Sequence, residues 1–136
     1  MNRADLQKLA ELRIKEAIVL LNNDCYEGAY YLAGYAVECA LKACIAKKTQ
    51  EHDFPDRKLV NQSYTHNLLE LIRAAGLDLD KKMKSSGMFS DYWAVVKDWS
   101  EEVRYDTSVN DKKANNMIEA ITSEKDGVMT WLKKWW

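Results

Sequence analysis

Residues 29–45 read AYYLAGYAVECALKACI, and this stretch decides the fold class of the chain. Apolar or small residues recur at steps of three and four, the rhythm of a buried stripe on an α-helix. The stripe consists of Ala29, Leu32, Ala33, Ala36, Val37, Ala40, Leu41, Cys44 and Ile45. Because most of these side chains are small, the pattern predicts a helix that neighbouring elements approach closely.

A second row lies on the adjacent face of the same helix. It contains Tyr31, Tyr35, Glu38 and Lys42, at steps of four, three and four. If exposed, the Glu38–Lys42 pair would contribute only about 0.2–0.5 kcal/mol and would simply solvate the surface. The alternative is that all four side chains line a ligand groove or a dimer contact.

Two long helices should form an antiparallel hairpin at the start of the chain. The first is predicted from Arg3 to Leu21 and the second from Tyr26 to Lys48, with Asp24 as the N-cap of the second. A break this short brings consecutive helices side by side. Gly34 lies inside the second helix, where glycine costs about 1 kcal/mol relative to alanine, so we expect a close packing contact there.

The middle of the chain is predicted to be less regular. Residues 49–64 contain Pro55 and read as a connector, and residues 80–88 read as a second one. Between them Thr65 resembles the N-cap of a short helix over 66–75, and Gly76 suits the left-handed position that ends it.

Two further helices are predicted towards the C-terminus, over residues 90–103 and 111–135, with a polar turn at 104–110. Their expected core residues are Phe89, Tyr92, Val96, Trp99, Val103, Ala114, Ile118, Ile121, Val128, Leu132 and Trp135. No segment alternates with a period of two, so we expect no sheet. Residues 1–136 therefore read as one all-α domain, an up-and-down bundle of four to five helices.

Bulk properties exclude several classes of function. A formal net charge of −1 argues against strong non-specific DNA binding. Cys25, Cys39 and Cys44 show no CxxC spacing and read as reduced thiols. The chain shows neither an apolar leader nor an apolar run near 20 residues, so we expect a soluble cytoplasmic protein with no membrane contact. No metal-ligand spacing, P-loop or GxGxxG pattern occurs, and we expect no metal and no cofactor.

The chain resembles the HEPN family, in particular its minimal stand-alone prokaryotic members. The resemblance rests on the string from Ala29 to Glu38 with Leu41-Lys42-Ala43, on Pro55, on Thr65-His66-Asn67-Leu68 and on Arg104-Tyr105, and it covers about residues 5–130. It implies a helical bundle that usually dimerises. It also implies roles in RNA cleavage, nucleotide binding, and toxin–antitoxin or defence systems beside a minimal nucleotidyltransferase.

One departure from the family pattern concerns catalysis. Catalytic HEPN ribonucleases carry an arginine and a histidine separated by four to six residues. At those spacings Arg104 is followed by Val109, Asn110 and Asp111, and no other arginine has a histidine at this distance. The standard ribonuclease motif is therefore absent.

Arg104, His66 and Tyr105 remain the candidate catalytic residues. His66 is either structural or a proton shuttle, since imidazole titrates near neutrality. Arg104 either complements the end of a helix dipole or grips a phosphate through two parallel hydrogen bonds. A joint role in RNA cleavage would require the imidazole as base and the guanidinium as the cation for the phosphorane.

The sequence thus favours a non-catalytic partner module. Its ligand or interface residues would be Tyr31, Tyr35, Glu38, Lys42 and Arg104. It would be a homodimer that binds a nucleotide, RNA or a companion nucleotidyltransferase. The main alternative is a metal-independent RNA endonuclease with a site around Arg104 and His66. A third interpretation is a plain helical interaction module held together by the second helix and by Trp135 and Trp136.

Overall fold

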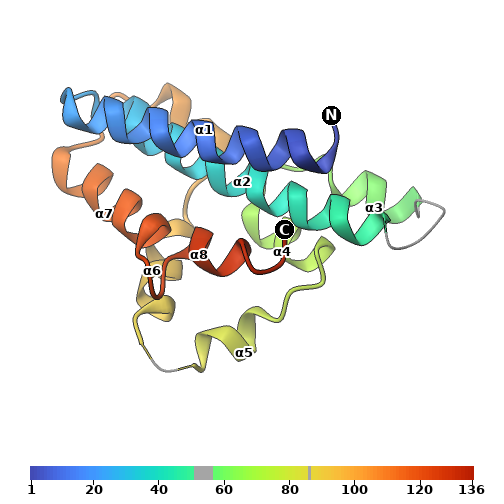
Figure 1. The fold of residues 1–136 in the computed structure, drawn as a ribbon. Helices are drawn as coiled ribbons and strands as arrows, with labels where there is room; N and C mark the ends of the chain where they lie inside the picture. The colour runs from blue at the N-terminus through green and yellow to red at the C-terminus, as the bar shows by residue number, and fades with distance from the viewer. Residues whose placement is uncertain (51–56, 86) are drawn as a thin grey trace.

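The computed structural model describes residues 1–50, 57–85 and 87–136, apart from the side chain of residue 50. Within these ranges the chain is helical and contains no strand, as predicted (Figure 1). The elements are α1 (Arg3–Asn22), α2 (Tyr26–Gln50), α3 (Arg57–Gln62), α4 (Leu68–Ala74), α5 (Leu79–Met83), α6 (Phe89–Val96), the 3₁₀ helix η1 (Glu101–Tyr105), α7 (Asp111–Thr122) and α8 (Val128–Leu132).

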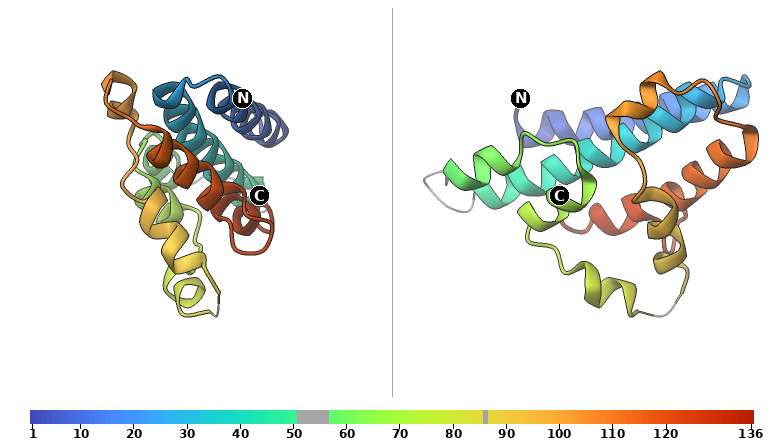
Figure 2. Two further views of the ribbon diagram at one scale, coloured as in Figure 1. Left: turned by 90° about the vertical axis from the view of Figure 1, so that its left-hand side faces the viewer. Right: turned by 180° about the vertical axis from the view of Figure 1, so that it is seen from behind.

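The predicted hairpin is present, and α1 and α2 lie side by side along their length (Figures 1 and 2). A capping box opens α1, in which Asn2 and Asp5 each accept the other's backbone N–H. The prediction that Asp24 caps α2 is wrong. Asp24 takes a left-handed conformation with φ of 61° in the turn, and its carboxylate accepts the Tyr26 hydroxyl at 2.9 Å.

Helix α2 is the centre of the core. It packs against α1, α4, α7, α8 and η1, and its predicted stripe is buried except for the partly exposed Leu32. The remaining core comes from Leu68, Leu71, Ile72, Phe89, Trp93, Val96, Trp99, Ala114, Met117, Ile118, Ile121, Val128, Trp131 and Leu132. Small residues on α2 leave room for these larger side chains.

Gly34 makes the predicted close contact, and its neighbour is the indole of Trp99. A Cβ at position 34 would lie 2.2 Å from Trp99 Cδ1, far inside van der Waals contact. The buried indole therefore occupies the space that a side chain at position 34 would need.

Both long C-terminal helices of the prediction are broken. Residues 90–103 divide into α6 and η1, and the break lets Trp99 reach Gly34. Residues 111–135 divide into α7 and α8 around Gly127, where a Cβ would lie 2.5 Å from the Ser123 carbonyl oxygen. Tyr92 and Val103 are partly rather than fully buried, and Trp135 is exposed.

The two predicted connectors contain helices. Helix α2 continues to Gln50 and α3 covers part of 49–64, while Pro55 lies outside the described residues. Asp78 opens α5 within the second connector, because its Oδ1 accepts the backbone N–H of Lys81 at 3.0 Å. Gly76 is left-handed with φ of 71° after α4, as predicted.

The two ends of the described chain meet. Arg3 Nη2 donates a hydrogen bond to the backbone carbonyl of Trp136, and Lys133 Nζ lies 3.7 Å from Glu11 Oε1. Both contacts connect α1 with the segment that follows α8.

Candidate functional site

Glu38 is 1 % exposed and is the buried charged residue in the described part of the chain. The interpretation of Glu38 and Lys42 as a solvated surface pair is therefore wrong for Glu38. A carboxylate taken out of water needs compensating partners, because desolvation of an unpaired charge costs several kcal/mol. Its position on α2 faces the segment that precedes α4.

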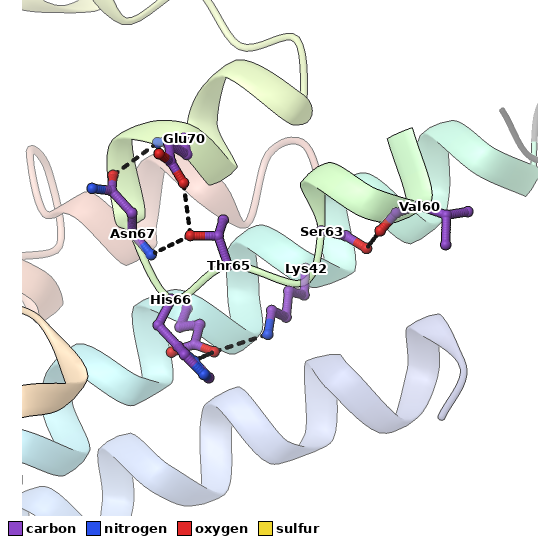
Figure 3. A network of polar contacts seen from close by, with 8 residues as sticks. Lys42, Val60, Ser63, Thr65, His66, Asn67 and Glu70 are labelled. Carbon is purple, nitrogen blue, oxygen red and sulfur yellow. Dashed lines mark hydrogen bonds and ion pairs between the residues drawn. The ribbon is translucent and has the colours of Figure 1, made fainter. Parts of the chain in front are cut away.

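Two cationic or titratable side chains meet this carboxylate at one oxygen. Lys42 Nζ donates to Glu38 Oε1 at 2.9 Å, and His66 Nδ1 lies 2.8 Å from the same atom (Figure 3). A carboxylate only accepts, so Nδ1 of His66 carries the proton and Nε2 is left for another partner. The His66 side chain is 49 % exposed, in contrast to the buried Glu38.

The loop before α4 holds His66 in place through its neighbours. Asn67 is the N-cap of α4, not Thr65, and its Oδ1 accepts the backbone N–H of Glu70 at 3.0 Å. Thr65 accepts the backbone N–H of Asn67 and donates its hydroxyl to the Glu70 carboxylate at 2.7 Å (Figure 3). His66 therefore precedes the helix instead of lying in its first turn.

An aromatic row continues from this cluster along α2. The rings of Tyr31 and Tyr35 stack with centroids 6.3 Å apart, and those of Tyr31 and Trp99 with centroids 6.1 Å apart. Tyr31 thus lies between two aromatic rings, and the Trp99 ring is the one packed on Gly34. Trp99 Nε1 is buried without a hydrogen-bond partner in the described residues.

Arg104 belongs to a second cluster, at the Tyr31 end of the row. Its exposed guanidinium lies over the Tyr105 ring, 4.8 Å from the centroid. The phenol groups of Tyr105 and Tyr31 raise the pKa of Arg104 further. Arg104 lies in η1, a five-residue 3₁₀ helix, and not at the end of the predicted helix over 90–103. The helix dipole that its charge would complement is therefore much smaller than predicted.

The structure brings some predicted site residues together and keeps others apart. Glu38, Lys42 and His66 form one cluster, and Tyr31, Arg104 and Tyr105 form the other. Glu38 lies seven positions after Tyr31, about 10 Å along the helix axis. In the described residues His66 pairs with Glu38, and it makes no ion pair or hydrogen bond with Arg104.

A comparison with protein-family models places the chain. The HEPN domain model matches residues 4–135. The chain belongs to the HEPN family. Neither a curated protein nor a solved structure gives a significant match. The family match agrees with the resemblance noted in the second helix, and it assigns no role to any single residue.

Sequence reasoning missed part of what builds this HEPN site. The loop network around His66 has a signal in the spacing of Thr65, Asn67 and Glu70, which is typical of a capped helix start. The meeting of Glu38 with His66 has no such signal, because 28 positions separate them.

Other features of the HEPN protein concern metals, thiols and membranes. Over 1–50, 57–85 and 87–136, no three His, Cys, Asp or Glu side chains gather as metal ligands would. All three cysteines are free, with Cys25 exposed and Cys39 and Cys44 buried. None of the described helices combines the length and apolar character that crossing a bilayer requires.

Proposed function

We propose that this HEPN protein is a non-catalytic partner module that binds RNA or a nucleotide on the polar face of α2. It would act beside a minimal nucleotidyltransferase, in a toxin–antitoxin or defence pair. The observation that carries the proposal is the buried Glu38 carboxylate, which holds Lys42 and the outward-facing His66 at one point. A buried carboxylate carries a desolvation cost, and here its ionic partners are two side chains that reach the surface.

The groups on this face suit a phosphate backbone. An ammonium group binds phosphate as a point charge, and the guanidinium of Arg104 binds it with two parallel hydrogen bonds. Tyr31 and Glu38, the α2 members of the two clusters, lie about 10 Å apart along the helix axis, a distance that one RNA strand would span. Recognition of this kind is electrostatic and largely independent of sequence.

A second candidate function is metal-independent RNA cleavage by His66, with Lys42 as the neighbouring cation, because Arg104 lies in the other cluster. Lys42 and His66 share one oxygen of Glu38, which places a cation beside an oriented imidazole. His66 Nε2 would take the proton of the 2′-hydroxyl, whose oxygen attacks phosphorus while the 5′-oxygen leaves with a proton from water. The missing Arg–His spacing supports binding over cleavage.

One experiment tests both functions with fluorescein-labelled single-stranded RNA and EDTA present throughout. We expect Arg104→Ala and His66→Ala each to weaken binding about fivefold to tenfold, and Arg104→Ala to reduce the log–log salt slope by about 0.7. Lys125→Ala, in the exposed turn before α8, serves as the matched control.

The outcomes separate the candidates. Unchanged affinity in both Arg104→Ala and His66→Ala contradicts the proposed RNA face. Cleavage products in the wild type that disappear in His66→Ala favour the endonuclease and exclude the non-catalytic role. Intact RNA with weakened binding in the variants supports the partner module.

A further inference from the structure

A cavity of about 720 Å³ lies away from the α2 polar row. Its walls are the C-terminal part of α2, the turn after α4, α5 and the segment around α8. In Figure 1, α5 lies at the lower edge of the molecule, away from the α1–α2 hairpin. None of the site residues predicted from the sequence lines it.

The cavity is strongly cationic. Its lining contains Lys47, Lys48, Lys81, Lys82 and Lys134 against one acid, Asp78. Asp78 is engaged as the N-cap of α5, where Oδ1 accepts a backbone N–H at 3.0 Å. In the described part of the chain none of the five ammonium groups is in an ion pair.

This concentration of charge contrasts with the rest of the molecule. The whole chain carries a net charge of −1, whereas the lining has five lysines and one aspartate. Like charges gathered around one hollow repel each other, and a bound anion relieves that repulsion. The lysines come from three separate segments, so an anion in the cavity would meet cations on several sides.

The cavity also has an aromatic side. Trp131 is almost fully buried, while Trp135 at the rim is 52 % exposed. A large exposed indole beside lysines offers a flat surface on which a ring can stack. Leu77 and Ala75 add apolar lining.

The left-handed turn at Gly76 helps to shape this cavity. With φ of 71° it redirects the chain after α4 towards α5. A Cβ at position 76 would lie 3.3 Å from Lys48 Nζ, so the ammonium of α2 rests over the glycine. The turn thereby brings the lysines of α2 and α5 to a common cavity.

We propose that this cavity binds a small phosphorylated ligand that also carries a flat ring. Lysines bind phosphate groups as point charges, and the ring would stack on Trp135. The volume falls within the 300–1,000 Å³ or so that is usual for small-molecule sites. This site is separate from the proposed RNA face and uses different residues.

Isothermal titration calorimetry tests the proposal with three probes: ATP, inorganic tripolyphosphate and adenosine. We expect ATP to bind more tightly than tripolyphosphate and adenosine to bind weakest, because charge and ring act together. The double variant Lys81→Gln/Lys82→Gln should lower the affinity for ATP and for tripolyphosphate by about tenfold or more. Trp135→Ala should lower the affinity for ATP and leave the affinity for tripolyphosphate within about twofold of the wild-type value.

The controls decide what a change in affinity means. Lys125→Gln removes an exposed lysine outside the cavity, and it should leave every affinity unchanged. Circular dichroism and thermal unfolding establish that each variant is folded. ATP and tripolyphosphate bound in the cavity should keep their affinity in His66→Ala and Arg104→Ala, whereas a nucleotide bound on the α2 face would lose affinity in these variants, so the two sites are told apart.

Three results would overturn the proposal. The first is that neither ATP nor tripolyphosphate binds at about 1 mM in about 50 mM salt, where phosphate contacts are strong. The second is that the lysine variant binds both probes like the wild type. The third is that adenosine binds as tightly as ATP, which would remove the phosphate from recognition.

Discussion

Gly34 is the residue at which helix propensity and packing oppose each other. Alanine would favour the helix by about 1 kcal/mol, yet its Cβ would overlap the buried Trp99 indole. The Trp99 ring is buried, packs on Gly34 and stacks on Tyr31, so it has little freedom to retreat. Packing decides the residue type at this position.

We therefore predict that Gly34→Ala lowers the free energy of unfolding by about 1–3 kcal/mol, as overpacked core substitutions do. Urea denaturation followed by circular dichroism measures the change. Gly28→Ala is the matched control in the same helix, because its Cβ would meet only Leu20 Cδ1 at 3.1 Å. Equal stability of the two variants would contradict the packing explanation.

Glu38 shows where residue-level prediction stops. The spacing of Glu38 and Lys42 predicted their contact, since residues four apart are neighbours on a helix. Burial of the carboxylate depended on His66, which arrives from a distant loop. Helical periodicity describes neighbours on one element and contains no information about which loop covers it.

At the scale of elements, the hairpin and α2 were predictable and the C-terminal helices were not. Apolar spacing continues through both breaks, because Trp99 and Val128 remain buried on either side of the bends. Gly127 and the polar residues 123–126 before it were local signals for the second break. The first break is imposed by the tertiary contact of Trp99 with Gly34.

Helix α2 also determines how its two thiols react. Burial raises the pKa of Cys39 to about 11 and that of Cys44 to about 12, against 9.0 for a free thiol. The folded thiols stay protonated where unfolded ones ionise. Their contribution to stability is thus complete below pH 9 and is lost as the pH rises through 11 to 12.

We predict that iodoacetamide at pH 8 alkylates only Cys25 in the folded protein, because thiolate is the reactive form and Cys25 is exposed. Intact mass spectrometry should show one adduct, and three after denaturation in guanidinium chloride. Cys25→Ser should then show none while folded. Rapid modification of Cys39 or Cys44 would mean that α2 opens in the native state.

At the scale of the whole molecule, α1 carries apolar side chains on its outer face. Leu12 is 46 % and Val19 is 55 % exposed, and seven residues place them above one another on the helix. Exposed apolar side chains that gather on one face mark the places where another subunit can pack. We therefore propose the α1 face as an alternative to the Tyr31, Tyr35, Glu38 and Lys42 row for the predicted homodimer contact.

We predict a dimer in light scattering, with twice the mass of one chain at micromolar concentration. The double variant Leu12→Lys/Val19→Lys should be monomeric with unchanged circular dichroism, because buried lysines oppose association. Leu69→Lys, an exposed apolar position on α4, should remain dimeric. A monomeric wild type would contradict the predicted dimer. A dimeric double variant would contradict the α1 face as its interface.

The lysine cavity illustrates why some sites escape prediction from a single sequence. No single segment has an unusual number of lysines. Two of the lining lysines lie in α5, two lie near the end of α2 and one follows α8. Only the Gly76 turn and the return of the chain bring them together. The family resemblance predicted the fold, but the position of these lysines around one cavity depends on how the segments pack in this molecule.

The bond between Arg3 and Trp136 makes the two ends of the chain neighbours in space. Two residues of extended chain reach only about 7 Å, so residue 1 cannot lie far from residue 136. Trp135 lines the lysine cavity. A group attached near residue 3 and one attached near residue 136 therefore lie on the same side of the molecule, close to Trp135.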